Sequence, residues 1–256
     1  MLRGIYTAAC GMDLQQAVLD KVSTNLANSA TPGYKKQKLV AESFPEHLVL
    51  CTGGRRPGGA EAAIGTFGPG CRVAQVVTSF EPGYVRQTGR AYDLCLDGPG
   101  FLTVEAPTGD DPARVAYTRN GSLRVDAEGY LVTADGRRLL GEGGPIQVGG
   151  ADFKISPQGQ VEIGGQAAGR LLLAEFDRPQ DLIREEGGLY ADVNGQAREA
   201  TATRVRQGFL ETANVEPVEE IKDLLAAVRA YEAGQRLIQA HDELLEKAVN
   251  QLGSTK

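Results

Sequence analysis

Residues 25–36 read NLANSATPGYKK, and they end a long helical pattern abruptly. Before this stretch, apolar or small residues recur at alternating intervals of three and four positions, as they do in a coiled-coil helix. Within it, Asn28, Pro32 and Gly33 belong to residue types that disfavour a continuing helix. The sequence therefore predicts a helix over residues 3–28, after which the chain leaves the helix axis.

The predicted N-terminal helix carries a seam of about three heptads. It would be roughly 40 Å long at 1.5 Å per residue. An isolated helix cannot bury such a seam, so this helix needs a partner. The seam residues are Ile5, Ala8, Met12, Leu19, Val22 and Leu26, with Gln15 as the one polar position.

The C-terminal segment is a candidate partner. Pro217 suits the first position of a helix, Glu219 and Glu220 suit its first turn, and Gly253 suits its end. Gly234 costs about 1 kcal/mol inside a helix, and we expect it to permit a close approach or a bend. The heptad positions are Ile221, Leu224, Val228, Tyr231, Gln235, Ile238, Asp242, Leu245, Val249 and Leu252.

The two ends also differ in charge. The first 40 residues hold more bases than acids, and the last 40 hold more acids than bases. This mild complementarity favours pairing of the two terminal helices. The alternative, in which each helix packs separately on the middle of the chain, stays open at this point.

The middle of the chain has the pattern of β structure. Strands are predicted over residues 72–80 and 169–176, with two short strands around Gly98 and Gly100. Residues 51–70 contain seven Gly and two Pro, and we expect them to form a flexible loop or linker.

Several dipeptides in this region favour β-turns. The segments VDAEGYL (125–131) and ISPQGQV (155–161) share the pattern apolar-x-x-x-Gly-x-apolar, which indicates a reused β-turn-β unit. The predicted turns are Asn120-Gly121, Glu128-Gly129 and Asp135-Gly136.

Together these patterns predict an α+β fold, in which paired N- and C-terminal coiled-coil-type helices have a central all-β domain inserted between them. The expected parts are a terminal helical assembly domain (1–40 with 207–256), a flexible Gly/Pro-rich loop (41–71) and a central β domain (72–206).

Composition narrows the possible functions. The net charge of −6 and the pI near 5.1 argue against nucleic acid as a partner, because phosphate binding needs a basic face. No run of 18 apolar residues predicts a membrane span. The N-terminus lacks the apolar core of a cleaved signal peptide, so we expect any export to use another route.

The sequence contains no P-loop, GxSxG or HExxH motif. Its two histidines, His47 and His241, have no second His or Cys at metal-ligand spacing. The cysteines match no zinc or redox pattern and are interpreted as buried or incidental thiols. No catalytic residue, metal, cofactor or small-molecule substrate is predicted. The cysteines are Cys10, Cys51, Cys71 and Cys95.

Longer motifs occupy both ends and part of the middle. Residues 11–37 read GMDLQQAVLDKVSTNLANSATPGYKKQ, and residues 207–250 read QGFLETANVEPVEEIKDLLAAVRAYEAGQRLIQAHDELLEKAVN. Both resemble the flagellar basal-body rod and hook protein family, and AYTRNGSLRVDAEGYLVTADGRRLLG (116–141) resembles its central YTR-(D/N)-G segment. The N-terminal matches are Gly11, Met12, Gln15, Gln16, Leu19, Asp20, Asn25, Leu26, Ala27, Asn28, Thr31, Gly33, Tyr34 and Lys35. The C-terminal matches are Gln207, Gly208, Leu210, Glu211, Asn214, Val215, Glu219, Arg229, Ala230, Tyr231, Glu232, Ala233 and Asp242.

The resemblance implies a structural subunit of the bacterial flagellar basal-body rod. Such a subunit would be exported by the flagellar type III apparatus and would polymerise through its terminal helices into a helical tube that transmits torque. The implied partners are copies of itself, neighbouring rod and hook subunits and the export apparatus. The residues alone leave a second class open, a secreted β-rich glycan-binding module or enzyme that dimerises through its helices.

If the terminal helices assemble in this way, their seams and the break at residues 25–36 should form the interface. We further expect Asn25 and Asn28 to bond backbone groups at the break, and Gly33 to turn the chain at positive φ. The residues expected at the assembly interface are Met12, Gln16, Leu19, Val22, Asn25, Leu26, Asn28, Ile221, Leu224, Val228, Tyr231, Ile238, Leu245, Val249 and Leu252.

Overall fold

The computed structural model of the chain describes residues 2–51, 62–106, 114–149 and 153–252. The chain divides into two compact units, and it passes from one to the other four times. The helical unit comprises Met1–Leu26, Gln37–Val77 and Pro217–Lys256. The β unit comprises Ala27–Lys36 and Thr78–Glu216.

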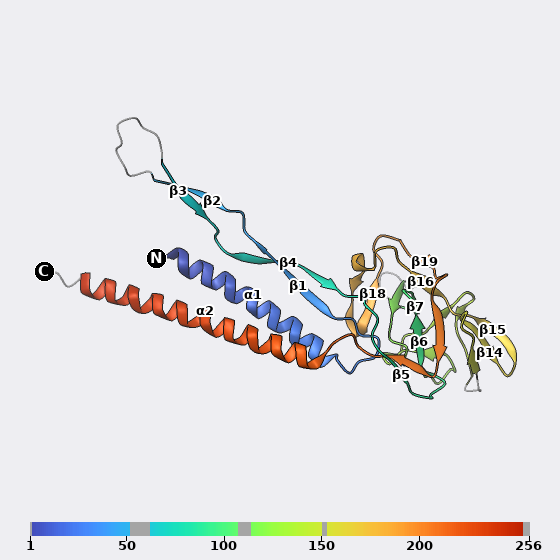
Figure 1. Cartoon of the computed structure of the whole chain (residues 1–256). Coiled ribbons are helices and arrows are strands. Elements are labelled where there is room, and N and C mark those ends of the chain that lie inside the picture. Colours follow the sequence, from blue (N-terminus) through green and yellow to red (C-terminus); the bar gives the residue numbers. More distant parts are fainter. Residues whose placement is uncertain (1, 52–61, 107–113, 150–152, 253–256) are drawn as a thin grey trace. The chain divides into compact units, whose positions relative to one another are not determined.

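Two long helices dominate the helical unit. α1 (Leu2–Ala27) and α2 (Pro217–Leu252) run side by side (Figure 1). This confirms the prediction of paired terminal helices around a β-rich middle. Among the described helices, neither is long and apolar enough to cross a bilayer.

Small residues let the two helices approach closely. A Cβ atom on Gly234 would lie 2.6 Å from Cγ of Met12, and one on Gly4 would lie 2.9 Å from Nε2 of His241. Since residues early in α1 meet residues late in α2, the helices are antiparallel. Gly234 therefore permits a close approach, which is one of the two roles expected for it.

The covered stripe of α2 differs from the predicted one. Ile221 and Val249 are 46% and 70% exposed, so α1 does not cover these two heptad positions within the chain. Gln235 and Asp242 are exposed as well. A close-packed antiparallel pair favours small residues at part of the contact, and among them Ala248 is half-buried while the bulkier Val249 beside it is exposed. The buried or half-buried positions are Glu220, Leu224, Ala227, Val228, Tyr231, Gly234, Ile238, His241, Leu245 and Ala248.

A two-stranded ribbon completes the helical unit (Figure 1). In it β1 (Gln37–Ser43) pairs with β4 (Cys71–Thr78), and β2 (His47–Cys51) pairs with β3 (Ala62–Phe67). Strands therefore stand where a flexible loop was expected over 41–71, because the backbones of β2 and β3 bond to each other in antiparallel register. Residues 52–61 of that expected loop lie outside the described residues.

The ribbon also contacts α1. The Thr7 hydroxyl donates to the Pro69 carbonyl at 3.2 Å, and a Cβ on Gly70 would lie 3.0 Å from Cβ of Cys10. Cys10, Cys71 and Cys95 are free thiols. Cys51 ends β2, and its side chain lies outside the described residues.

The β unit is built from short antiparallel strands. Its largest sheet has six strands in the order β17-β18-β8-β7-β16-β19, and β13-β14-β15 form a second sheet. Two-stranded pairings join β5 to β21, β6 to β20, β9 to β10 and β11 to β12. The strands up to β12 are β5 (Val85–Gln87), β6 (Leu94–Asp97), β7 (Phe101–Glu105), β8 (Val115–Thr118), β9 (Arg124–Val125), β10 (Leu131–Val132), β11 (Leu140–Gly141) and β12 (Gly144–Pro145). The later elements are β13 (Phe153–Ile155), β14 (Gln160–Ile163), β15 (Gln166–Arg170), β16 (Leu173–Glu175), η1 (Pro179–Asp181), β17 (Ile183–Arg184), η2 (Glu186–Gly188), β18 (Leu189–Ala191), β19 (Arg198–Glu199), β20 (Arg204–Gln207) and β21 (Phe209–Glu211).

The six-stranded sheet has an aliphatic face and an aromatic face. Successive residues of a strand point to opposite sides, so Phe101 and Leu102 lie on different faces. The main core gathers Leu102 with the aliphatic residues of neighbouring strands. On the other face Phe101 packs among Tyr117, Phe176 and Tyr190 with edge-on ring contacts.

One predicted hairpin is wrong. Asn120-Gly121 does not join two paired strands, because β8 pairs with β7 and β18 while β9 pairs with β10. Gly121 instead meets Leu94, which donates its N–H to the Gly121 carbonyl at 2.9 Å. A Cβ on Gly121 would lie 1.7 Å from the Leu94 carbonyl oxygen. The glycine thus serves a close backbone approach rather than a hairpin turn.

The predicted β-turn-β repeat is confirmed. Val125 pairs with Leu131, and Ile155 pairs with Val161. In both turns the residue after the first apolar one accepts a backbone N–H four positions later, and a glycine follows at φ near +85° (Gly129 +86°, Gly159 +83°). Asp135-Gly136 also forms its predicted turn, with Gly136 donating to the Thr133 carbonyl.

Two strand predictions need finer bounds. The predicted strand over 169–176 is interrupted, since β15 ends at Arg170 and β16 begins at Leu173 in another sheet. The strands around Gly98 and Gly100 form as predicted, but β6 and β7 belong to different sheets. The chain turns between them at Gly98 and Gly100, which lie so close to Thr203 that neither has room for a Cβ atom.

Gly234→Ala tests the close approach of the helices, with Gly11→Ala as its matched control. A Cβ on Gly11 meets no atom within 4 Å, so this change should stabilise α1 by about 0.5–1 kcal/mol through helix propensity. Gly234→Ala should show no such gain, because the new methyl overlaps Met12. Thermal unfolding followed by circular dichroism at the helical band measures both. Adding Met12→Ala should restore the gain at position 234, and equal gains at both glycines without it would contradict the contact.

Candidate functional site

The N-terminal and C-terminal motifs meet at buried polar residues close to where the chain passes between the units. In the helical unit, Asn25 is 1% exposed and lies near the end of α1. Its Oδ1 accepts the Gln37 N–H at 3.0 Å, while its Nδ2 donates to the Gln37 carbonyl at 2.9 Å and to Glu220 Oε2 at 3.1 Å. The Asn25 amide thereby holds residues 25 and 37 together, where the chain leaves and re-enters the helical unit, and it links them to α2. This confirms the expected backbone bonding by Asn25.

The chain turns sharply within residues 28–33. Thr31 donates its N–H to the Asn28 carbonyl at 3.0 Å and its hydroxyl to Asn28 Oδ1 at 3.3 Å. Gly33 has φ +68°, as expected, and its N–H donates to the Glu211 carbonyl at 2.8 Å. A Cβ on Gly33 would lie 2.2 Å from the Arg119 carbonyl oxygen. Both the dihedral angle and the lack of space therefore require glycine.

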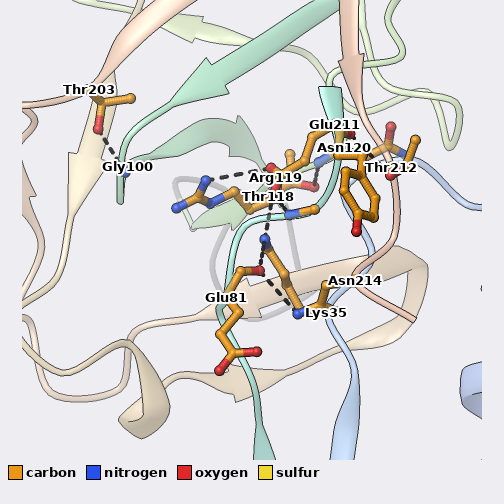
Figure 2. A network of polar contacts seen from close by, with 12 residues as sticks. Lys35, Glu81, Gly100, Thr118, Arg119, Asn120, Thr203, Glu211, Thr212 and Asn214 are labelled. Atoms are coloured by element: carbon orange, nitrogen blue, oxygen red, sulfur yellow. Dashed lines mark hydrogen bonds and ion pairs between the residues drawn. The ribbon is translucent and has the colours of Figure 1, made fainter. Parts of the chain in front are cut away.

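In the β unit, Lys35 forms the centre of the site, with no exposed surface. Its Nζ donates to Glu211 Oε1 at 2.6 Å and to the Glu81 carbonyl at 2.8 Å. The same carboxylate oxygen accepts the Gly83 N–H at 2.9 Å. On the other oxygen, Arg119 Nη1 makes a longer ion pair at 3.6 Å. Figure 2 shows the Lys35 and Arg119 side chains next to Glu211.

Two buried cations therefore share one buried carboxylate. Burial lowers the pKa of Lys35, and the adjacent Glu211 carboxylate opposes that shift. Burial also lowers the pKa of Arg119, again opposed by Glu211. The Arg119 guanidinium lies 4.9 Å from the centre of the Phe101 ring, where the aromatic face offers partial negative charge. Nearby, burial raises the pKa of the Cys95 thiol, which agrees with its interpretation as a buried thiol.

Asn214 makes a second amide clamp. Its Oδ1 accepts the Lys36 N–H at 2.7 Å, and its Nδ2 donates to the carbonyls of Ser79 at 2.9 Å and Glu81 at 3.1 Å. One side chain from the C-terminal motif thus joins Lys36 to Ser79 and Glu81 within the β unit. Tyr34 packs beside it on Ala213 and Val215.

Gln207 has a similar role at the open edge of β13. Its Oε1 accepts the Ile155 N–H at 3.0 Å, and its Nε2 donates to the carbonyls of Phe153 at 3.1 Å and Ala91 at 2.8 Å. The side-chain amide thus satisfies backbone groups that a neighbouring strand would otherwise bond. Chemically, all these contacts hold backbone in place, and no group of three or more His, Cys, Asp or Glu within the described residues is placed to bind a metal.

The predicted interface residues differ in how exposed they are. On α1, Val22 and Asn25 are buried, Met12, Leu19 and Leu26 are half-buried, and Gln16 is exposed. Asn28 is half-buried in the turn. On α2, Ile221 and Val249 are exposed, and the side chain of Leu252 lies outside the described residues. The half-buried residues on α2 are Leu224, Val228, Tyr231, Ile238 and Leu245.

The heptad pattern missed several residues that the fold uses. Glu220 is 1% exposed and Ala227 3%, although neither has a long apolar side chain. Lys35, Arg119 and Glu211 were not predicted to meet, since charged residues are rarely buried. For Lys35 and Glu211 the available signal was their place in the two terminal motifs.

Three family models match separate parts of the chain. Residues 5–35 match the model described as "Flagella basal body rod protein", and residues 95–163 match "Flagellar hook protein FlgE/F/G D1 domain". Residues 206–252 match "Flagellar basal body rod FlgEFG protein C-terminal". The first and last matches cover the segments that contain Asn25, Lys35, Glu211 and Asn214.

Full-length relatives agree with these matches. The flagellar basal-body rod protein FlgG of Borreliella burgdorferi is 31% identical, covering 98% of this chain and 98% of the relative. FlgG of Bacillus subtilis is 29% identical over 98% of this chain and 99% of its own length. The flagellar basal-body rod protein FlgF of Caulobacter vibrioides is 30% identical over 92% and 91%.

The chain belongs to the flagellar basal-body rod protein family. It is a structural subunit of the basal-body rod and not an enzyme. The buried polar residues that join its terminal motifs therefore have an architectural role.

Gly33→Ala tests the turn, with Gly136→Ala as control. Both glycines have positive φ, but a Cβ on Gly136 meets no atom within 4 Å. The control should cost about 1–2 kcal/mol of unfolding free energy through the left-handed backbone alone. Gly33→Ala should cost more than about 3 kcal/mol, because the methyl also overlaps the Arg119 carbonyl. Urea unfolding measures both variants, and similar losses would show that the close approach is unimportant.

Lys35→Met tests the ion pair. It leaves the Glu211 carboxylate buried without its closest cation, so the unfolding free energy of the β unit should fall by about 3–5 kcal/mol. Arg198→Ala breaks the Arg198–Asp177 pair, whose side chains are 71% and 64% exposed, and should cost at most about 1 kcal/mol. Urea unfolding by circular dichroism gives both values. A loss for Lys35→Met no larger than that of the control would rule out the central role of the pair.

Proposed function

We propose that this chain polymerises through α1 and α2 into the wall of the rod, as a helical tube that transmits torque. The observation that carries the proposal is the apolar surface left on α2 after α1 has covered its seam. Large apolar side chains seldom line an exposed helix unless a partner covers them. The exposed residues are Val218, Ile221, Leu225, Leu237, Leu244 and Val249.

Their burial on assembly would be energetically useful. A large aliphatic side chain contributes about 1.5–3 kcal/mol when it moves from water into a packed interior. Part of this gain is offset by ordering the helices. In this proposal the terminal helices are weakly ordered in the free chain and become firmly ordered within the polymer.

In this proposal the terminal helical domain (1–40 with 207–256) assembles and the central β domain (72–206) lies outside it. The partners would be copies of this chain, neighbouring rod and hook subunits, and the flagellar type III export apparatus. Among the expected interface residues, Gln16, Ile221 and Val249 are exposed and available to a neighbour. The seam residues would contribute by holding α1 and α2 together.

Purified hook–basal bodies from the source organism test the proposal. Mass spectrometry should find peptides of this chain at stoichiometric levels in the rod. A strain lacking the gene should lose the rod and motility, and the full chain should restore both. A chain lacking residues 217–252 should restore neither. Complete, motile basal bodies without this chain would contradict the proposal.

A further inference from the structure

The outward side of α2 carries a line of basic residues. Lys222, Arg229 and Arg236 recur at every seventh position, so they lie on one side of the helix about 10 Å apart. All three are exposed, and the side chains of Lys222 and Arg236 are 73% and 80% exposed. We name these three residues the basic ridge.

Neighbouring acids do little to neutralise this ridge. Lys222 Nζ lies 3.9 Å from Asp223, and Arg236 Nη2 lies 3.7 Å from Glu232. Both are long, solvent-exposed pairs, of a kind that contributes little stability. The ridge thus remains available to an acidic partner.

The outward side of α1 carries a matching line. Tyr6, Asp13 and Asp20 also recur at every seventh position and are all exposed, Tyr6 by 71%. Asp20 Oδ1 accepts a hydrogen bond from Gln16 within the same helix at 3.3 Å. We name these three residues the acidic ridge, in which Tyr6 offers a ring face that attracts a cation.

The two ridges are opposite in charge and equal in spacing. Each has three positions at the same pitch, so two acids and one aromatic ring can face three bases along two helices that run side by side. They cannot meet within one chain, because α1 and α2 already contact each other through other faces, at Gly4, Met12 and Asn25 of α1. Only a second copy can bring them together.

The surface beside the basic ridge suits a closely packed helix. Exposed residues follow it at alternating intervals of four and three, the spacing of a heptad seam. Most are alanine, which lets two helix backbones approach, and the two leucines are 46% and 56% exposed. The residues are Ala226, Ala230, Ala233, Leu237, Ala240 and Leu244.

We propose that α1 of one copy docks its acidic ridge on the basic ridge and adjoining alanine surface of α2 in a second copy. This inference rests on the proposed function and adds the surface through which copies join. The contact is heterologous, since it uses different faces of the two copies. In a pair of copies, one keeps its basic ridge free and the other keeps its acidic ridge free. Such a contact propagates into an open polymer. The charges also fix which faces meet, because like-charged ridges repel.

Charge reversal in cells that carry a single version of the full-length gene tests the contact. Asp13→Lys with Asp20→Lys makes both ridges basic, and Arg229→Glu with Arg236→Glu makes both acidic. Each double variant should be lost from purified basal bodies, with loss of motility. Asp181→Lys with Glu186→Lys is the control, because it changes charge equally at exposed positions of the β unit and should leave incorporation unchanged.

Restoration makes the test specific. A chain with all four ridge changes again has ridges of opposite sign and should return to the rod. Co-expression of the two double variants should also restore incorporation, because each ridge then finds its complement on the other variant. Circular dichroism of the purified chains should show unchanged helix content.

The outcomes separate the two proposals. Absence of the unaltered chain from basal bodies would refute the proposed function. Presence of the unaltered chain, with both double variants incorporated as well as the control, would refute the ridge contact. Loss of the double variants that neither the four-change chain nor co-expression reverses would also refute it.

Discussion

The buried ion pair between Lys35 and Glu211 is the constraint on which the β unit depends. It joins a lysine eight residues beyond the end of α1 to a glutamate at the end of β21, and both side chains are almost fully inaccessible. A buried charge without a partner is strongly destabilising, so the chain must bring these two segments together or leave both charges unsatisfied. Arg119, which directly follows β8, adds a second cation beside Glu211. The pair therefore favours a backbone path that brings Lys35 and Glu211 together over paths that leave them apart.

The two asparagine clamps extend this constraint to the points where the chain passes between its units. Asn25 fixes residue 37 and Glu220 within the helical unit, while Asn214 fixes residues 36, 79 and 81 within the β unit. Both use an amide side chain in place of a neighbouring peptide group. The family motifs at the two ends of the chain thus contact each other within each unit, through Asn25 in the helical unit and through Asn214 in the β unit.

With their inner faces occupied by each other, the helices retain exposed outer faces, which we propose as the assembly surfaces. Small residues such as Gly234 bring α1 and α2 close together, which leaves larger residues such as Ile221 and Leu237 outside. A rod subunit needs this division, because one set of contacts must hold the subunit together while another joins it to its neighbours. In the contact that we propose, the opposite charges on the outer sides of α1 and α2 would determine which faces of two copies meet.

From the sequence alone one could predict the terminal helices, the β-rich middle, the repeated turn at Gly129 and Gly159, and the family. These depend on local spacing and on turn residues, whose preferences act over a few positions. Only the tertiary structure decided that Gly121 serves a close approach to Leu94, that Glu220 and Ala227 rather than Ile221 are covered on α2, and that Lys35, Arg119 and Glu211 meet. The reason is physical: which face of a helix is covered, and which charges become partners, depends on the distances between segments far apart in the chain, and local sequence preferences contain no information about those distances.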